Sequence, residues 1–587
     1  MSIADILSEV NQRAIKKLRQ ELSADSRFEE LTDHQAHSTN TIATWKTFVD
    51  ALQNDWEVHI EISSNFPFEV PKTRIINGEE LFFKIPHIDH DGTVCIVPNE
   101  TIINSKDPVK IFFYLIKSVK EILRGAKESE FQEEFLSYWI RGKSITPQTF
   151  LLLSSPESIQ SQFYFLKYQK MFLLAHSETE ISTWVKHKEG IEHKLEIVQN
   201  GICINLNVIP SPNDYPNSMF DLLKMIKKMS IESLNLIAAR LINSNQATLL
   251  IFRHKAKSGY ILPGLLFFGQ LLKNNGKFTK GFRKESIPSK LLITRATGTL
   301  KKQEIFKCLV DRVDHKWIHS RGGDGKCYKD ISILVIGCGA LGGYVGHLLS
   351  RAGIGKLTFI DKDTLEVNNI GRHILGINSV GCSKATALAC YLNKQLPHLE
   401  INGICNNWEN VFKADSSFPY KFDLIISTTA NWNSEESLNL IFKKNMLPPV
   451  LYGWLEPYAV AGHAMLCFEG SGCLACHMDD WGRFGFSVST FEDSTLMTEP
   501  GGCTQYQQYG TAALMPVATM IVTTALDSFD SDYSTSILHT WISSKDHFNK
   551  TSAKISPVWS DRVKEQGFSH IFETEWSSSS SCDLCNE

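Results

Sequence analysis

The sequence lacks a clear excess of charge of either sign. Its 60 lysines and arginines are nearly balanced by 64 acidic residues, which gives a formal net charge of -4. A protein that binds nucleic acid or an anionic membrane through its overall charge needs a basic excess. We therefore expect no nucleic acid and no membrane among the partners of this chain.

Long apolar runs are also missing, both near the start of the chain and elsewhere. Residues 2–21 predict a charged helix rather than the apolar core of a signal peptide. The most apolar long segment, "AALMPVATMIVTTAL" (512–526), is interrupted by Pro516 and is shorter than the roughly 20 residues that cross a bilayer. This segment is typical of a buried helix, and we expect a cytoplasmic protein.

The sequence shows no internal repeat and no sign of a disulfide framework. A chain of 587 residues with 14 cysteines and no secretory signal is expected to keep its thiols reduced. Most of these cysteines lie in apolar stretches, which predicts inert positions in a core. Three groups differ in their surroundings: Cys95, Cys503, and the two CxxC pairs Cys473/Cys476 and Cys582/Cys585.

The length is too great for one hydrophobic core, so several domains are expected. We predict an α/β multidomain protein with domains at 1–148, 149–322 and 323–587. In the first we expect helices at 3–22 and 107–125 and extended segments at 44–52, 56–63 and 72–78. In the second we expect helices at 219–229 and 233–242 and strands at 247–255 and 290–297. After the polar joint "SRGGDGK", the third has the strand–helix alternation of a mainly parallel sheet.

A glycine-rich turn opens the third domain. The apolar strand "ISILVIG" ends in a GxGxxG pattern formed by Gly337, Gly339 and Gly342, which leads into a helix. Glycines at these positions permit a tight turn and let backbone N–H groups approach a phosphate at the helix N-terminus. Asp361 closes the next strand, where a carboxylate can accept hydrogen bonds from ribose hydroxyls. By itself the turn fits NAD, FAD or ATP.

The residues after Asp361 distinguish between these nucleotides. The segment "DKDTLEVNNIGRH" supplies Asp363, Asn369 and Arg372, and Lys384 begins the next helix. An enzyme that splits ATP between its α- and β-phosphates must neutralise the charge on the leaving pyrophosphate, as Arg and Lys do well. The alternative is a dehydrogenase in which Asn369, Arg372 and Lys384 are surface residues.

This segment resembles the ThiF/MoeB/ubiquitin-activating superfamily, in which the glycine turn, D-x-D-x5-N-x2-R and V-G-x-x-K form the ATP site. The resemblance implies a Rossmann-like adenylating domain that activates the C-terminal carboxylate of a ubiquitin-like or sulfur-carrier protein, with Arg372 catalytic. It implies the following ATP-binding residues: Gly337, Gly339, Gly342, Asp361, Asp363, Asn369, Arg372 and Lys384. The family usually has a magnesium-binding Asp where this chain has Ala430. We expect Asp363 and Asn431 to hold Mg²⁺ together with water, and the alternative is an unusual adenylation.

Five cysteines of the third domain carry further expectations. Two CxxC turns each direct two thiolates at one point, so Cys473, Cys476, Cys582 and Cys585 are predicted to bind a structural Zn²⁺. The alternative is two unrelated reduced pairs. Cys503 lies in the glycine-flanked loop "TEPGGCTQYQQYG". Family members that form a thioester carry their nucleophile in this segment, which makes Cys503 the candidate and an inconsequential loop cysteine the alternative.

The N-terminal domain contains "FPFEVPKTRI" followed by "IPHIDHDGTVCIVP". This pattern resembles the ubiquitin-conjugating fold, an α+β domain in which a proline-rich turn precedes an H-P-N segment and the acceptor cysteine. The resemblance implies that Cys95 is the acceptor. His87 stands where the family has the asparagine of H-P-N, and it is predicted to stabilise an oxyanion or act as a base. Exposed loop histidines without a role are the alternative.

The architecture resembles the fused activating–conjugating enzymes of bacterial CBASS anti-phage operons. The resemblance covers the two ends of the chain, and it covers the α/β linker domain between them only by position. The resemblance implies ATP-dependent adenylation of the C-terminus of a cGAS/DncV-like nucleotidyltransferase. It also implies transfer through Cys503 and Cys95 to a target amine, and a homodimer formed through the adenylating domain. A sulfur-carrier activator, which has no need of Cys95, and a non-catalytic scaffold remain as alternatives.

Overall fold

The computed structural model describes most of the chain. The described residues are 3–31, 40–96, 106–125, 130–131, 135–140, 145–191, 198–229, 231–243, 247–256, 259–268, 280–283, 287–300, 304–479, 483–492, 494–498, 505–530, 533 and 535–586. The chain forms two compact units, one with residues 1–149 and 200–310 and the other with residues 150–199 and 311–587. The boundaries at 148 and 322 stay predictions.

The N-terminal part of the first unit is an antiparallel sheet covered by two helices. The strands run in the order β1 (Glu29–Glu30), β2 (Thr41–Ala51), β3 (Asn54–Ser63), β4 (Lys72–Ile75) and β5 (Thr93–Val94). Helices α1 (Ile3–Leu22) and α2 (Pro108–Gly125) bury Leu18, Leu115 and Val119 against Trp45 and Ile60. Both predicted helices and the three predicted strands of this region are confirmed.

A second sheet in the same unit contains β9 (Gln199–Asn205), β10 (Ala247–Ala256), β11 (Gly259–Ile261), β12 (Pro263–Phe268) and β13 (Phe306–Arg312). β9 and β10 are parallel, whereas β10–β12 and β12–β13 are antiparallel. Four helices accompany this sheet: α4 (Phe135–Trp139), α6 (Met219–Met229), α7 (Ile231–Asn243) and α9 (Ser289–Leu300).

The strand predicted at 290–297 is wrong, because this segment lies in helix α9. Pro288 precedes the helix, and its carbonyl accepts hydrogen bonds from the backbone N–H groups of Leu291 and Leu292. A short apolar run does not distinguish a strand from a buried helix, and the proline before it favours the start of a helix.

In the second unit, the segment 150–199 packs against the C-terminal part of the chain. It contains β6 (Thr149–Leu152), β7 (Gln162–Tyr168), β8 (Met171–Ala175) and α5 (Glu178–Glu189). Helix α5 contacts α12 (Lys384–Gln395). His187 Nδ1 lies 2.9 Å from the carbonyl oxygen of Pro397, and Lys188 Nζ donates to the carbonyl of Lys394 over 3.1 Å. The C-terminal end of α12 is therefore held by α5.

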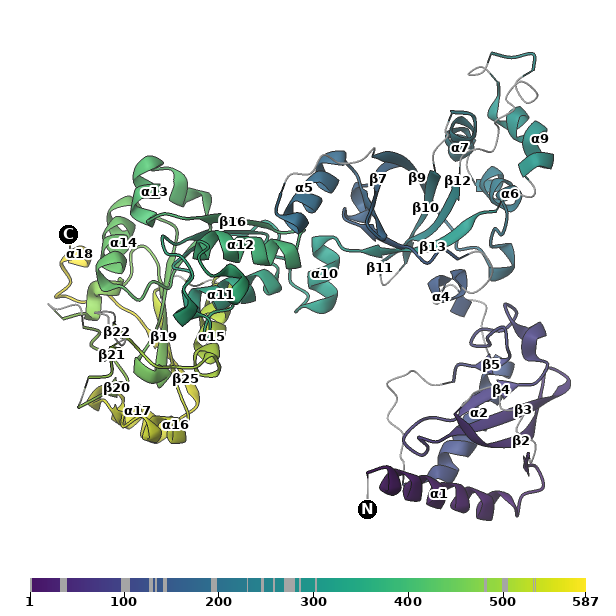
Figure 1. The fold of residues 1–587 in the computed structure, drawn as a ribbon, viewed down its shortest axis with the longest axis horizontal. Helices are drawn as coiled ribbons and strands as arrows, with labels where there is room; N and C mark the ends of the chain where they lie inside the picture. The colour runs from purple at the N-terminus through teal and green to yellow at the C-terminus, as the bar shows by residue number, and fades with distance from the viewer. Residues whose placement is uncertain are drawn as a thin grey trace. The chain divides into compact units, whose positions relative to one another are not determined.

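An eight-stranded sheet forms the centre of the C-terminal region (Figure 1). Its order is β16 (Glu400–Ile404), β15 (Lys356–Ile360), β14 (Ser332–Ile336), β17 (Leu424–Ser427), β18 (Val450–Leu455), β19 (Ala461–Cys467), β23 (Ile537–Ile542) and β25 (His570–Glu575). The first five strands are parallel and the last three join antiparallel. The predicted parallel sheet is confirmed, with an antiparallel extension.

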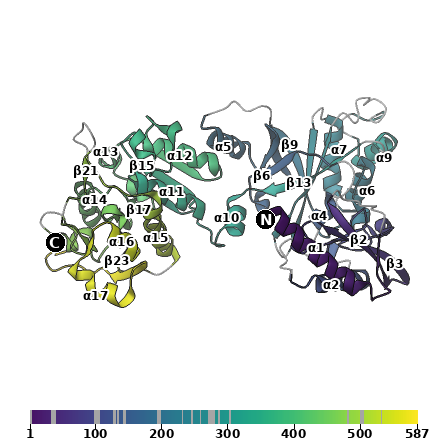
Figure 2. The same ribbon diagram turned by 60° about the horizontal axis from the view of Figure 1, so that its bottom comes forward.

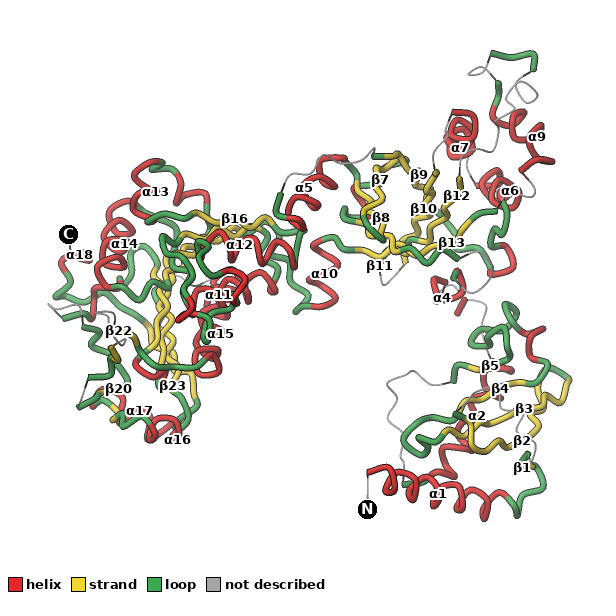
Figure 3. The backbone as a smooth tube through the Cα atoms, in the orientation of Figure 1, coloured by secondary structure: helices red, strands yellow, loops and turns green. Residues whose placement is uncertain are grey.

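Helices cover both faces of this sheet, as Figures 2 and 3 show from the ribbon and the backbone tube. On one face α11 (Ala340–Ala352), α12 and α15 (Thr511–Asp530) pack on Ile333 and Val335. On the other, α13 (Trp408–Ala414) and α14 (Trp432–Asn445) pack on Leu334 and Ile336. The alternation follows from the period of two in a strand. The carboxyl ends of β14, β15 and β17 meet at one edge, where open α/β sheets bind ligands.

Helix α15 contains the apolar segment 512–526 and runs through Pro516 rather than stopping at it. Among the described residues, it is the one helix long and apolar enough to cross a membrane. Leu514, Val517, Ala518 and Ile521 are fully buried in the core beside β18 and β19. The predicted buried helix is confirmed.

Shorter elements complete the region. They are β20 (Ser489–Thr490), β21 (Met497–Thr498), β22 (Gln505–Tyr506), β24 (Lys554–Ile555), α10 (His315–Gly322), α16 (Lys545–Lys550), α17 (Pro557–Gln566) and α18 (Asp583–Asn586). β20 pairs with β24, and β21 pairs with β22.

Candidate functional site

The glycine turn lies between β14 and α11, as the sequence predicts. Gly337 has φ 90°, a backbone conformation that residues other than glycine rarely adopt. Its N–H donates to the carbonyl of Ile360 over 2.9 Å. A Cβ on Gly342 would lie 2.0 Å from the carbonyl oxygen of Gly337, whereas a Cβ on Gly339 would have no atom within 4 Å. Gly342 is thus needed for close packing, and Gly339 leaves open space at the start of α11.

The two glycines give a matched pair of substitutions. Gly342→Ala should force α11 away from the turn, cost about 1–3 kcal/mol as overpacking does, and lower the Tm by roughly 2–10 °C. Gly339→Ala should leave the Tm unchanged because its Cβ has room. Thermal unfolding followed by circular dichroism measures both. Equal Tm values for the two variants would contradict this assignment.

Asp361 holds the glycine turn in place. Its Oδ2 accepts a hydrogen bond from the N–H of Cys338 over 2.6 Å, and its Oδ1 accepts from the N–H of Asp363 over 2.8 Å. The carboxylate predicted to bind ribose therefore also joins the end of β15 to the turn after β14.

Lys384 and Asp363 form an ion pair near the turn. Lys384 begins α12 after the N-cap Ser383, and its Nζ lies 3.2 Å from Asp363 Oδ2. The N–H of Lys384 donates to the carbonyl of Asp363 over 2.9 Å. The Lys384 side chain is 13% exposed and the Asp363 side chain 54%, so the carboxylate is the more accessible partner.

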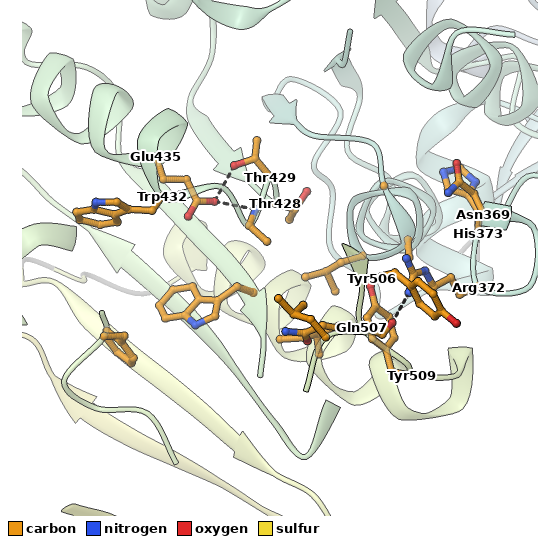
Figure 4. A pocket seen from close by; sticks show the side chains of 18 of the residues that line it. Asn369, Arg372, His373, Thr428, Thr429, Trp432, Glu435, Tyr506, Gln507 and Tyr509 are labelled. Atoms are coloured by element: carbon orange, nitrogen blue, oxygen red, sulfur yellow. Dashed lines mark hydrogen bonds between the residues drawn. The ribbon is translucent and has the colours of Figure 1, made fainter. Parts of the chain in front are cut away.

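Arg372 and Asn369 follow on the same segment. Asn369 ends a 3₁₀ turn (Val367–Asn369), and its side-chain oxygen accepts from the N–H of Glu366 over 3.1 Å. Arg372 donates from Nη1 to the carbonyl of Gln507 over 2.7 Å, and its guanidinium lies 4.7 Å from the centre of the Tyr509 ring (Figure 4). Arg372 is thereby linked to the segment that begins at β22.

His373 was missed by the sequence reasoning, although it adjoins Arg372 in "GRH". Its Nε2 lies 2.8 Å from the carbonyl oxygen of Cys338, and its Nδ1 accepts from the N–H of Leu375 over 3.0 Å. This pair of contacts assigns the neutral Nε2–H tautomer, and burial lowers the pKa of His373. The ring therefore fixes the carbonyl of the glycine turn.

These elements enclose a cleft of about 650 Å³. Of the predicted nucleotide residues, Gly339, Asn369, Arg372 and Lys384 line it. The other described lining residues are Ala340, Leu341, His373, Thr428, Thr429, Ala430, Trp432, Glu435, Trp454, Leu455, Leu474, Met478, Phe484, Leu496, Tyr506, Gln507 and Tyr509. The cleft thus combines two cations with aromatic side chains, which no local motif predicted. These are Trp432, Trp454, Phe484, Tyr506 and Tyr509.

Asn431, predicted as a magnesium ligand, is exposed and caps α14. Its side-chain oxygen accepts from the N–H of Ser434 over 3.3 Å. Among the described residues, Asn431 is not part of the cleft lining. The amide oxygen already accepts this hydrogen bond, and the role of Asn431 as a magnesium ligand stays a prediction.

Glu435 was also not predicted from the sequence, and its side chain contacts the loop after β17. It is 7% exposed, and its Oε1 accepts from Ser427 Oγ over 3.1 Å, Thr429 Oγ1 over 2.9 Å and the N–H of Ala430 over 3.2 Å. Burial raises the pKa of Glu435 to about 7 in spite of these hydrogen bonds. Figure 4 shows Glu435 beside Thr429 on the side of the cleft opposite Arg372.

The four predicted zinc ligands meet at one point. The sulfur atoms of Cys473, Cys476, Cys582 and Cys585 all lie within 4.8 Å of one another. The distances are 3.7 Å for Cys473–Cys582, 3.9 Å for Cys473–Cys476 and 3.5 Å for Cys476–Cys585. A tetrahedron of sulfurs about 2.3 Å from Zn²⁺ has edges of about 3.8 Å, so the arrangement fits this metal.

Cys95 lies at the end of a tight hairpin in the first unit. Its N–H donates to the carbonyl of His87 over 2.8 Å, so the backbones of the two predicted catalytic residues are direct neighbours. Gly92 has φ 80°, and a Cβ there would lie 2.2 Å from the carbonyl oxygen of Ile75. Cys95 is exposed, as an acceptor thiol must be.

His87 adopts φ 65°, and its side chain is directed to a helical residue rather than left free in a loop. Its Nε2 lies 3.3 Å from Glu130 Oε2, and its N–H donates to Tyr138 Oη over 2.7 Å. These contacts hold the strained residue next to Cys95.

Cys503 lies outside the described residues. Before and after it, β21 pairs with β22, with Met497 opposite Tyr506 and Thr498 opposite Gln505. Tyr506 and Gln507, which follow Cys503 in the sequence, line the cleft.

Two family models match the chain. Residues 322–556 match the ThiF family, and residues 12–146 match the prokaryotic E2 family B. The chain therefore has an E2-like domain at its N-terminus and a ThiF-like adenylating domain in its C-terminal region. The match confirms the predicted fold class and the recognition of a fused activating–conjugating architecture. It also confirms the predicted kind of enzyme, an ATP-dependent enzyme of ubiquitin-like protein activation and conjugation.

Three named proteins are similar to all or part of this chain. The ATP-dependent ubiquitin transferase-like protein Cap2 of Pseudomonas aeruginosa is 24% identical, over 71% of this chain and 75% of its own. The protein of the same name from Escherichia coli is 23% identical, over 72% and 77%. Ubiquitin-like modifier-activating enzyme 5 of Drosophila erecta is 28% identical over 25% of this chain and 39% of its own.

Proposed function

We propose that the ThiF domain uses ATP to adenylate the C-terminal carboxylate of a partner protein. The observation that carries this proposal is that Arg372, Lys384 and Asn369 line one cleft with the glycine turn. A carboxylate oxygen attacks the α-phosphorus, the bond to the β-phosphate oxygen breaks, and pyrophosphate leaves. Arg372 and Lys384 neutralise the charge that develops on the leaving group.

The acyl group then passes through two thiols. The Cys503 thiolate displaces AMP to form a thioester, and Cys95 of the E2 domain accepts the acyl group by transthiolation. An amine of a target protein attacks the Cys95 thioester and forms an amide, with His87 stabilising the oxyanion or accepting the proton. Carrying both thiols on one chain raises the effective concentration of each at the other.

The partner that we propose is a cGAS/DncV-like nucleotidyltransferase, whose C-terminus is conjugated to target proteins in bacterial anti-phage defence. The support is the fused architecture and the similarity to proteins named ATP-dependent ubiquitin transferase-like protein Cap2. The same resemblance supports a cytoplasmic homodimer formed through the ThiF domain.

Mg²⁺ accompanies ATP in this proposal and supplies charge neutralisation to the phosphates. Asp363 fits as a carboxylate ligand because its side chain is accessible and lies beside Lys384. The place of the expected acid after β17 is taken by Ala430.

A structural Zn²⁺ at the four cysteines is the second metal of the proposal. The N–H of Cys473 donates to the sulfur of Cys476 over 3.2 Å, and Asn439 Nδ2 donates to the sulfur of Cys473 over 3.4 Å. Such N–H···S contacts orient and stabilise thiolate ligands. The cluster would join the end of the chain to the segment after β19.

Removal of this metal should lower stability. Cys582→Ala is expected to reduce the zinc content, measured by inductively coupled plasma mass spectrometry, and to lower the Tm by about 5 °C or more, because metal binding contributes directly to folding. The exposed Cys405 provides the control, since Cys405→Ala should change neither quantity. Full zinc content in Cys582→Ala would exclude the site.

The proposed function is tested by exchange of labelled pyrophosphate into ATP. The purified full chain is incubated with ATP, Mg²⁺ and a cGAS/DncV-like nucleotidyltransferase, intact or without its last residues. Exchange that depends on the intact C-terminus is expected. No exchange with either protein would reject adenylation of this partner.

A further inference from the structure

The nucleotide cleft contains a single carboxylate among its described lining residues, Glu435. The other two acids near the glycine turn already make contacts. Asp361 accepts from two backbone N–H groups with its two oxygens, and Asp363 pairs with Lys384. Glu435 is therefore an acid in the proposed ATP-binding cleft that has no role in the proposed transfer steps.

Glu435 lies close in space to the place where the resembling family has its magnesium-binding Asp, although it is not at that position in the sequence. The loop after β17 has Ala430 where the resembling family has its magnesium-binding Asp. Glu435 reaches back from the first turn of α14 and accepts the N–H of Ala430 itself, over 3.2 Å. Its carboxylate is therefore adjacent to the backbone from which the expected acid would project.

One oxygen of this carboxylate is available to a ligand. The three hydrogen bonds that the Glu435 side chain accepts from described residues all end on Oε1. Neither cation of the cleft is paired with it, since Lys384 contacts Asp363 and Arg372 contacts Gln507 and Tyr509. Glu435 is 7% exposed and has no described cation beside it, so a cation that arrives with the substrate would favour the ionised form of this buried carboxyl group.

We propose that Glu435 is a second carboxylate, in addition to Asp363, that holds Mg²⁺ with the triphosphate, in place of the acid absent at Ala430. Oε1 fixes the side chain to Ser427, Thr429 and Ala430, and Oε2 would hold the metal. Magnesium commonly binds through one or two carboxylates, with substrate phosphates and water completing its shell. This inference rests on the proposed use of ATP and specifies how its metal is bound.

The test compares ATP binding with and without metal by isothermal titration calorimetry, using Glu435→Gln and the unaltered protein. Glutamine keeps an oxygen that accepts from Ser427, Thr429 and Ala430 but loses the negative charge. With Mg²⁺, the variant should need about 10- to 100-fold more metal for the same ATP affinity. With EDTA, it should bind ATP as tightly as the unaltered protein or more tightly, because repulsion between Glu435 and the phosphates is gone.

A direct readout of the metal and two further variants complete the design. Electron paramagnetic resonance of Mn²⁺ with a non-hydrolysable ATP analogue should show weaker Mn²⁺ binding in Glu435→Gln. Glu436→Gln, on the exposed side of the same helix, should behave like the unaltered protein. Ala430→Asp combined with Glu435→Gln should restore metal affinity, since Asp tolerates the left-handed backbone found at φ 49°.

The outcomes separate this inference from the function on which it rests. An equal loss of ATP affinity with and without Mg²⁺ would identify Glu435 as a structural acid and overturn the inference. Unchanged Mg²⁺ and Mn²⁺ dependence in Glu435→Gln would overturn it as well. If the unaltered protein binds no ATP in either condition, the proposed function fails, and the inference fails with it.

Discussion

With Cys95 replaced by alanine, conjugation of the nucleotidyltransferase to target amines is expected to stop completely. Pyrophosphate exchange and one thioester on the ThiF domain should remain, because Cys95 acts only after activation. A non-reducing gel, run before and after addition of a thiol reductant, shows whether a reductant-sensitive adduct is present.

Cys503→Ala should remove every thioester in the same experiment, while exchange of pyrophosphate into ATP continues. The difference between the two variants in the thioesters that remain is the essential result, since it shows that Cys503 acts before Cys95. Cys382→Ala, an exposed cysteine of the ThiF domain, is the control and should retain both adducts. An adduct that survives in Cys503→Ala but not in Cys95→Ala would reverse the assignment and make Cys95 the first acceptor.

Arg372→Ala is expected to lower the rate of pyrophosphate exchange by about 10²- to 10³-fold, the range for removal of one group that stabilises transition-state charge. The guanidinium lines the cleft and is held in place by Gln507 and Tyr509. Arg372→Lys should recover only part of the rate, because an ammonium group lacks the planar fork and stacks poorly on tyrosine.

The control for Arg372 is Arg351→Ala, which removes an exposed arginine from the end of α11 and should leave exchange unchanged. Circular dichroism checks that the Arg372 variants fold. Exchange at the unaltered rate in folded Arg372→Ala would show that the charge of the leaving pyrophosphate is neutralised by other groups.

The nucleotide residues could be predicted because their chemistry is local in the sequence. Gly337, Gly339 and Gly342 follow a strand at fixed spacing, and Arg372 and Lys384 follow Asp361 in one pattern. The structure brings Asn369, Arg372 and Lys384 to one cleft with Gly339. The CxxC spacing likewise anticipated a cluster whose halves are more than a hundred residues apart.

The remaining parts of the site depend on contacts that no local pattern encodes. Tyr506, Gln507 and Tyr509 line the cleft because their segment lies against Arg372. Glu435 is one of two adjacent glutamates in an amphipathic helix, and only the fold shows which of them is buried. The sequence predicts a strand where helix α9 lies, because a short apolar run occurs both in strands and in buried helices.

Helix α12 connects the segment 150–199 with the nucleotide cleft. Its first residue is Lys384, and the carbonyls at its other end are held by His187 and Lys188 of α5. A helix of 12 residues spans about 18 Å and resists bending over that length. We therefore expect a displacement of α5 to shift Lys384 as well, which would couple the segment 150–199 to the nucleotide cleft.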